Sequence, residues 1–264
     1  MQTRMFLIPL LAPCLALTPC TRASAQASAD SGRAIVEKSQ QVLFGYKTLT
    51  VAGEMTLSRG SETIGERTFN VELIEREAPD AYDQARIVIA APTALKDTQL
   101  LSWSSETGAD QQWLVTPRTH RAQRIADRGR QAAFVSSTFS YEDILKWQVD
   151  DYDYVRAGQA VCAAGTCVVV EAKPRNRFSS YSLLKAYYDD QYRLSQVEYY
   201  EAGRDRPRKT LVHSGYVRQG ATWQPTRSVM TDHATETTTD IVWSRYQLNV
   251  AVDERVMSPA SVGR

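Results

Sequence analysis

From Tyr46 onward, apolar and polar residues alternate along most of this chain, and this alternation constrains the fold more than any other feature. The first run alternates polar residues with Val51, Gly53, Met55 and Leu57. Because successive side chains of a β-strand point to opposite faces, a period of two predicts half-buried strands. Such runs recur at regular spacing, joined mostly by short polar turns, so we expect an antiparallel meander. The runs cover 46–57, 69–73, 85–91, 99–103, 112–115, 152–156, 166–172, 181–188, 193–200, 210–217, 222–230 and 236–248.

A different pattern precedes the first strand. Residues 31–44 carry apolar residues such as Ile35 and Leu43 among charged and glutamine residues, which predicts one helix that stops at Gly45. The chain shows no internal repeat, no low-complexity segment and no linker that would divide it. We therefore predict a mainly β (α+β) fold in which one helix packs on a large curved antiparallel sheet of about 11 strands.

The segment between residues 126 and 147 interrupts the meander. Ser140 could cap a short helix, and that helix would carry on one side Tyr141, Ile144, Leu145 and Trp147. A long excursion from a sheet, with helix and aromatic residues, is typical of a lid. We expect residues 128–147 to act as a gate.

The N-terminus has the features of a secretory signal. Residues 6–18 are almost wholly apolar and follow a short basic start, but the run is too short to span a bilayer. Ala23 and Ala25 give the small-x-small pattern that signal peptidase needs. We expect residues 1–25 to be a signal peptide cleaved after Ala25, with Ala29 as the alternative, and residues 26–264 to form a single domain.

Two cysteines in the N-terminal segment allow an alternative, in which Cys14 or Cys20 is lipidated and anchors a lipoprotein. Proline directly precedes each of them, whereas a lipidation site prefers a small flexible residue there, so we favour cleavage. We accordingly expect a periplasmic protein that is free of its leader.

Only Cys162 and Cys167 remain in the mature chain, with four residues between them in a glycine-containing turn beside a β-favouring run. In an oxidising compartment such a pair predicts a disulfide that clamps a hairpin. Closing so small a loop stabilises the folded state by about 2 kcal/mol in the chain-entropy model. A zinc site would need two further ligands, and the neighbouring sequence has neither histidine nor another cysteine.

Charge and motifs argue against several classes of function. Removing residues 1–25 takes Arg4 and Arg22 from 31 basic residues and none from 30 acidic ones, leaving 29 against 30, so nothing indicates a nucleic-acid partner. The histidines stand widely apart without a metal motif, and no nucleophile elbow, phosphate loop or dinucleotide fingerprint occurs. They are His120, His213 and His233. We therefore expect no enzymatic activity, metal or cofactor, although a hydrolase using a serine and a histidine stays a minor alternative.

Several short blocks are specific to a family. Residues 112–117 (Gln-Trp-Leu-Val-Thr-Pro), the segment 121–125, Phe134 and the block 139–143 (Phe-Ser-Tyr-Glu-Asp) together resemble the signature of outer membrane lipoprotein-sorting-like proteins, a branch of the LolA-like superfamily. Residues 55–57, 92–101 and 199–203 with Lys209 are similar to flanking features of that family. The chain departs from the pattern at 136–138, where the family commonly has Gly-Ser-Asp, and at Asp97, where it has glycine.

The resemblance implies an incomplete β-barrel, an open curled sheet closed by helices around an apolar cavity that shelters acyl chains. We expect aromatic and apolar side chains to bind the ligand from the cavity or lid, and arginines to dock a headgroup or partner. Tyr187 and Tyr188 face opposite sides of their strand, so at most one enters a cavity. The candidate cavity and lid residues are Trp113, Phe134, Phe139, Tyr141, Leu145, Trp147, Tyr187 and Tyr199, and the candidate docking residues are Arg121 and Arg124.

The resemblance also implies a function. It indicates a carrier that takes a lipid or lipoprotein from an inner-membrane exporter, of the resistance-nodulation-division or the lipoprotein-releasing type, toward a possible outer-membrane acceptor. The alternative is an envelope-stress sensor or regulator with a LolA-like ligand domain. Such regulators usually add a second domain, and only a short polar tail follows Leu248.

Overall fold

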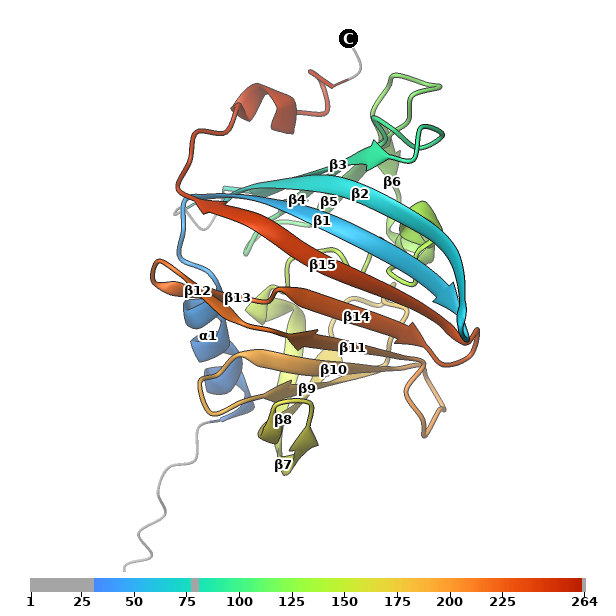
Figure 1. Cartoon of the computed structure of the whole chain (residues 1–264). Coiled ribbons are helices and arrows are strands. Elements are labelled where there is room, and N and C mark those ends of the chain that lie inside the picture. Colours follow the sequence, from blue (N-terminus) through green and yellow to red (C-terminus); the bar gives the residue numbers. More distant parts are fainter. Residues whose placement is uncertain (1–30, 77–80, 263–264) are drawn as a thin grey trace, which may run out of the picture.

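The computed structural model describes residues 31–76 and 81–262 of the chain (Figure 1). The expected signal peptide, its cleavage points after Ala25 or Ala29, and the two N-terminal cysteines lie outside the described residues. Within them the helices are α1 (Gly32–Leu43) and the 3-10 helices η1 (Asp127–Gln131), η2 (Phe134–Ser136), η3 (Val149–Asp151) and η4 (Glu254–Met257). The strands are β1 (Thr48–Arg59), β2 (Glu62–Ile74), β3 (Asp83–Ala91), β4 (Gln99–Ser104), β5 (Gln111–Val115), β6 (Gln123–Ile125), β7 (Tyr152–Cys162), β8 (Gly165–Pro174), β9 (Leu183–Tyr188), β10 (Leu194–Tyr200), β11 (Lys209–Ser214), β12 (Val217–Gln219), β13 (Thr222–Gln224), β14 (Arg227–Asp232) and β15 (Thr237–Leu248).

Thirteen strands of the described chain form one open antiparallel sheet that curls along its length (Figure 1). Their order is β6-β5-β4-β3-β2-β1-β15-β14-β11-β10-β9-β8-β7, and β12 and β13 form a separate two-stranded ribbon. The predicted mainly β, open and curled antiparallel sheet is therefore confirmed. Two expected strands, 210–217 and 222–230, are each divided in two, because Gly215 turns the chain with φ 63° and Pro225 stands between β13 and β14.

The concave face of the sheet carries the main core. Val51, Val71, Ile87 and Leu100 are register partners across β1, β2, β3 and β4, and all four are buried. On the other face, Asn70, Glu72 and Val88 are more exposed, whereas Ala52 and Leu101 are buried as well. The period of two in the sequence thus corresponds to one buried row across four neighbouring strands.

The N-terminal helix packs on the end of the sheet formed by β7, β8 and β9. The Ser31 hydroxyl accepts a hydrogen bond from the amide of Ala34 at 3.2 Å and begins α1, which ends at Leu43, one residue before the predicted end at Phe44. Ile35 and Val36 are buried against a patch of β8 and β9 that includes Tyr188. A side chain at Gly32 would lie 3.0 Å from the backbone of β7, so the helix approaches this edge strand closely.

The lid segment, residues 126–147, packs on the concave face and is built from 3-10 turns. The short α-helix expected after Ser140 does not form. An α-helix would pair the Tyr141 carbonyl with the amide of Leu145, but that carbonyl instead accepts a hydrogen bond from Gln112 Nε2 at 2.9 Å. The Leu145 amide bonds to Glu142 O at 3.3 Å, which is a 3-10 contact. The contact with the sheet decides the local conformation.

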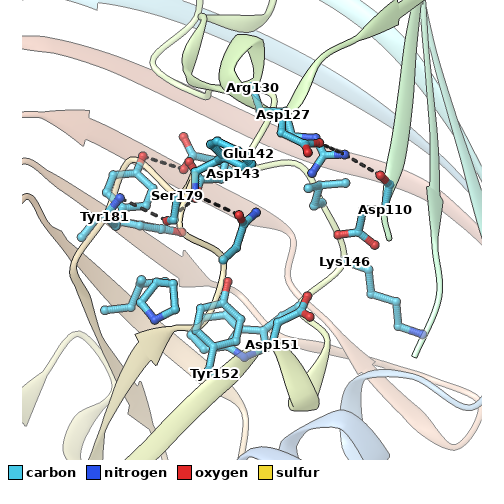
Figure 2. A pocket seen from close by; sticks show the side chains of 17 residues that line it. Asp110, Asp127, Arg130, Glu142, Asp143, Lys146, Asp151, Tyr152, Ser179 and Tyr181 are labelled. Atoms are coloured by element: carbon cyan, nitrogen blue, oxygen red, sulfur yellow. Dashed lines mark hydrogen bonds and ion pairs between the residues drawn. The ribbon is translucent and has the colours of Figure 1, made fainter. Parts of the chain in front are cut away.

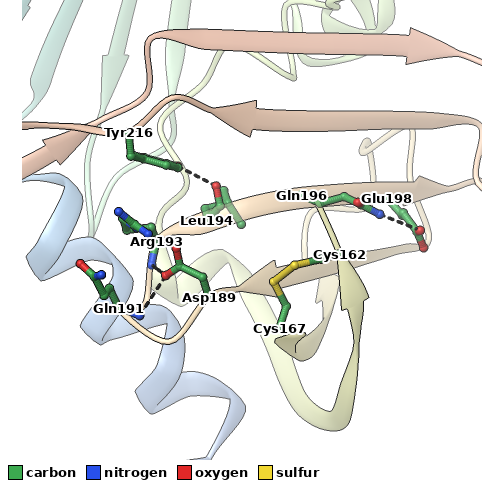
Figure 3. Close-up of a disulfide and its surroundings, with 9 residues drawn as sticks. All are labelled: Cys162, Cys167, Asp189, Gln191, Arg193, Leu194, Gln196, Glu198 and Tyr216. Carbon is green, nitrogen blue, oxygen red and sulfur yellow. Dashed lines mark hydrogen bonds and ion pairs between the residues drawn. A yellow bond between two sulfur atoms is a disulfide. The ribbon is translucent and has the colours of Figure 1, made fainter. Parts of the chain in front are cut away.

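The predicted disulfide joins Cys162 to Cys167 across the turn between β7 and β8 (Figure 3). Cys167 is 1% exposed and packs with Val169 and Tyr187. The bond therefore clamps the last hairpin of the sheet at the end of its edge strand.

Candidate functional site

An apolar cavity of about 280 Å³ lies between the concave face of the sheet and the lid segment. Strands from both ends of the sequence supply one wall, and Phe134, Phe139 and Ile144 of the lid supply the other. Its sheet-derived apolar lining consists of Met55, Phe69, Val71, Leu73, Ala85, Ile87, Leu211, Ile241 and Trp243. Hydrocarbon side chains surround most of this space, which suits an apolar ligand.

The aromatic wall of the cavity depends on a glycine. Gly53 pairs with Phe69 on one side and with Trp243 on the other. A Cβ atom at Gly53 would lie 2.3 Å from Cζ of Phe69, so the Phe69 ring lies over the strand where a side chain is missing. The ring then meets Trp243 edge-on, with centroids 5.6 Å apart and planes at 88°. The glycine in β1 thereby shapes the cavity wall.

A second cavity of about 360 Å³ adjoins the first. The two share Leu73, Ala85, Ile144, His213 and Trp243. The second cavity is also lined by Phe44, Leu145 and Trp147, and it reaches a charged rim of Glu75, Asp83 and Lys146. Together they fall in the size range of small-molecule sites and run from an apolar interior to a polar mouth.

Polar contacts fasten one side of the lid. The carboxylate of Asp143 has no exposed surface and accepts hydrogen bonds from the Ser140 amide, the Tyr181 hydroxyl and Lys209 Nζ, each at 2.8 Å. Its neighbour Glu142 accepts from the Ser180 amide at 2.9 Å and from the Ser179 hydroxyl. Figure 2 shows Glu142 and Asp143 turned toward Ser179 and Tyr181. These contacts tie the lid to the chain before β9 and to β11.

The other side of the lid is fastened to Glu75 just after β2, to β3 and to β7. Lys146 Nζ lies 2.6 Å from Asp83 Oδ2 and 3.4 Å from Glu75 Oε1, where burial raises the pKa of Glu75. Trp147 stacks on Tyr152 with centroids 4.8 Å apart and donates from Nε1 to the Tyr154 hydroxyl at 2.8 Å. The apolar cavity is thus enclosed by a segment whose residues 140–147 are held to the sheet on two sides.

A smaller pocket of about 80 Å³ lies beside the lid and is rich in carboxylates (Figure 2). Burial raises the pKa of Asp110 to about 6 and also raises the pKa of Asp151. The buried Arg130 donates from Nη2 to the Asp110 carbonyl and pairs with Asp127 at 3.3 Å. This pocket is smaller and more polar than the two apolar cavities, which suit an apolar ligand better.

The structure brings some of the predicted ligand residues together. Phe134 and Phe139 line the first cavity, and Leu145 and Trp147 line the second. Tyr141 packs edge-on against Phe134, with centroids 5.9 Å apart. Tyr199 lines the carboxylate-rich pocket and touches Tyr181, with centroids 4.8 Å apart.

Other candidates lie elsewhere. Gln112 contacts the lid, so alternation places Trp113 on the opposite face of β5, where it meets Trp103 edge-on at 5.1 Å. Tyr187 packs beside the disulfide rather than at a cavity. Arg121 and Arg124 are exposed at the β5–β6 hairpin, outside the two apolar cavities.

Sequence reasoning missed three contributors to the site. His213 carries no metal motif, and Lys209 directly follows Arg208, yet the first borders both cavities and the second holds the lid. Asp143 belongs to the block 139–143, whose pattern alone does not show that its carboxylate contacts Tyr181 and Lys209. The alternation within β11 was the available signal, because it places Lys209, Leu211 and His213 on one face.

Two further findings on the described residues concern a membrane-spanning helix and a metal site. Among residues 31–76 and 81–262, no helix is both long enough and apolar enough to cross a membrane. In the same part of the chain, no cluster of three or more histidine, cysteine, aspartate or glutamate side chains is arranged to hold a metal ion.

Comparison with known proteins assigns the fold. A domain from Vibrio parahaemolyticus named for outer membrane lipoprotein sorting has a TM-score of 0.82 at 25% identity, over 88% of this chain and 98% of that one. A DUF1329 family protein from Desulfovibrio piger has a TM-score of 0.81 at 22% identity, over 88% and 97%. A LolA superfamily protein from Nitrosomonas europaea has a TM-score of 0.67 at 14% identity, over 87% and 98%.

The sequence comparisons are consistent with this assignment. No curated protein matches the chain. A family model with the description "-like: Uncharacterized protein" matches residues 81–264, which is more than half of the chain. The chain therefore belongs to the family of this model, and it shares its fold with a domain named for outer membrane lipoprotein sorting and with a LolA superfamily protein.

Proposed function

We propose that this protein is a periplasmic carrier that binds the acyl chains of a lipid or lipoprotein and ferries it from an inner-membrane exporter toward the outer membrane. One observation carries the proposal: an apolar cavity lies between the concave sheet and a lid that polar contacts hold in place. The LolA-like fold supports a carrier-like role, and such a carrier needs no catalytic group.

The energetics suit transfer rather than permanent storage. Each buried methylene contributes about 0.8 kcal/mol, so ten methylenes would contribute about 8 kcal/mol before any opposing term. Admitting a chain requires the lid to move, which separates Asp143 from Lys209 or Lys146 from Asp83. This cost offsets part of the gain from burial, so the cargo remains releasable.

Several features support the proposed location and partners. The N-terminal signal expected from the sequence and the disulfide Cys162–Cys167 both favour an oxidising compartment outside the cytoplasm. An exporter of the resistance-nodulation-division or lipoprotein-releasing type would supply the cargo, and an outer-membrane acceptor would receive it. Arg121 and Arg124 are exposed and suit an anionic headgroup or an acidic surface on such a partner.

Lipid analysis of the purified protein tests the proposal. The full chain is produced in a bacterial envelope, and its bound lipids are identified by native mass spectrometry and extraction. Ala85→Phe fills a position that lines both cavities, and the matched control Ala90→Phe alters an exposed position on the same strand. We expect wild type and A90F to carry lipid and A85F to carry little.

Two results would contradict the carrier. A wild-type protein that is free of lipid and also ignores added phospholipid and lipopeptide would refute acyl-chain binding. A stable complex with an anti-sigma factor in place of an exporter would favour the sensor.

A further inference from the structure

The two apolar cavities share the side chain of His213, whose Nε2 atom has no hydrogen-bond partner among the described residues. His213 lies on β11 opposite Ser228 of β14, and its Nδ1 lies 2.8 Å from Ser228 Oγ. The side chain is enclosed by protein yet keeps accessible surface, because it borders both cavities.

The neighbouring side chains determine whether Nε2 of His213 is a hydrogen-bond donor or an acceptor. Trp243 Nε1 is only a donor, and it donates to Ser228 Oγ at 2.8 Å. The Ser228 hydroxyl then has its own proton to donate, and His213 Nδ1 is the partner within reach. We therefore assign Nδ1 as the acceptor, which places the ring proton on Nε2. Burial lowers the pKa of His213 to about 4, so the ring is neutral near pH 7.

The other polar side chains of the first cavity are already satisfied. Ser228 is shared between the histidine and the tryptophan, and Asp143 holds three partners. An apolar site with one neutral donor favours a ligand that has one uncharged acceptor along an apolar chain. A carboxylate would have to lose its hydration without a positive partner, and a bare hydrocarbon would leave the donor unpaired.

We propose that His213 Nε2 donates a hydrogen bond to the carbonyl oxygen of an acyl ester or acyl amide, so that the cargo is recognised at its acyl linkage. The acyl tail then lies in the first cavity beside Phe69, and the remainder of the molecule passes through the second cavity toward Lys146. This inference rests on the proposed carrier function and adds a specificity residue and the chemical class of the ligand to it.

The experiment compares two probes of equal length on the delipidated full chain. Methyl hexadecanoate carries the carbonyl and octadecane does not, and each competes with a fluorescent apolar dye. We expect wild type to bind the ester about 2- to 12-fold more tightly than the alkane, the range that one net hydrogen bond is worth. His213→Phe should abolish that ratio and retain alkane binding, whereas His213→Gln, which keeps an N–H donor, should restore part of it.

Nitrogen-15 NMR of the wild-type histidines checks the same idea without a variant. The ester should shift the Nε2–H resonance of His213, and octadecane should not. A dipalmitoyl phospholipid and a dipalmitoylated cysteine peptide, compared on wild type and H213F, identify the source of the acyl group by which of them loses affinity.

Several results would overturn the inference. Equal affinity for ester and alkane, or a ratio that survives in H213F, would remove the role of the histidine while leaving the carrier intact. Binding of neither probe would instead refute the carrier itself, and the inference with it. Release of hexadecanoic acid from the ester would show that Ser228 and His213 perform hydrolysis rather than recognition.

Discussion

Among the contacts of the lid, the loss of the buried Asp143 carboxylate should lower the free energy of unfolding most. Asp143 has a fully buried side chain, and its partner Lys209 is 12% exposed. Asp143→Asn keeps the size of the side chain but removes its charge, which leaves the lysine ammonium without its partner. Breaking one partner of a buried ion pair typically destabilises a protein by about 3–5 kcal/mol. Because Lys209 keeps some contact with solvent, we expect about 3 kcal/mol.

Urea unfolding at 25 °C measures this change, and hydrogen exchange of the amides in residues 134–145 reports whether the lid opens first. The matched control is Asp253→Asn, because Asp253 and its partner Arg255 are 45% and 86% exposed. Exposed ion pairs contribute little to stability, so D253N should leave the free energy of unfolding nearly unchanged.

A double variant separates the loss of the Asp143–Lys209 attraction from the cost of leaving the lysine charge without a partner. Replacing both members of a buried pair by uncharged residues is far less damaging than replacing one. Asp143→Asn combined with Lys209→Met should therefore be more stable than Asp143→Asn alone. The reasoning is refuted if D143N behaves like D253N, or if the double variant is no more stable than the single one.

Three further predictions concern other parts of the molecule. Gly53→Ala should displace the Phe69 ring, lower the free energy of unfolding by about 1–3 kcal/mol and weaken dye binding. The control is Gly65→Ala, whose new Cβ atom would contact only the flexible end of Arg67, and it should change neither stability nor dye binding. Burial raises the pKa of Asp110 from 3.8 to about 6, so the folded state gains stability as pH falls from 6 to 4. Asp110→Asn should therefore stabilise the protein above pH 6, by at most about 3 kcal/mol, and have no such effect below pH 4 in urea titrations. Replacing both Cys162 and Cys167 by serine should lower the free energy of unfolding by about 2 kcal/mol. A reducing agent should lower the free energy of unfolding of the wild type and leave that of the serine variant unchanged.

Local patterns predicted the strands well, because each strand shows its two faces through its own sequence. The alternation of Val51, Met55 and Leu57 with polar residues corresponds to the buried face of β1. The helix α1 was equally clear, since Ser31 begins it and Gly45, with φ 101°, follows its end. Both signals lie within a dozen neighbouring residues.

The candidate site was harder to predict because it depends on contacts between distant residues. The capping pattern after Ser140 is real, with the Asp143 amide 3.3 Å from the Ser140 hydroxyl, but Gln112 of another strand takes the carbonyl that the helix needed. Trp113 belongs to a family-like block and still points away from the cavities. Which face of a strand is concave is decided by the curl of the whole sheet, which no single strand reveals.

The strand order has a consequence for the timing of assembly. β15, the last strand in the sequence, pairs with β1, the first, and lies in the middle of the sheet, where it contributes Ile241 and Trp243 to the cavity wall. Pairing residues so far apart in sequence is a slow step of folding. A chain that crosses a membrane N-terminus first therefore has no complete cavity until its C-terminal region has followed. For the proposed carrier this means that cargo is loaded only onto a complete chain, so that loading follows export rather than accompanying it.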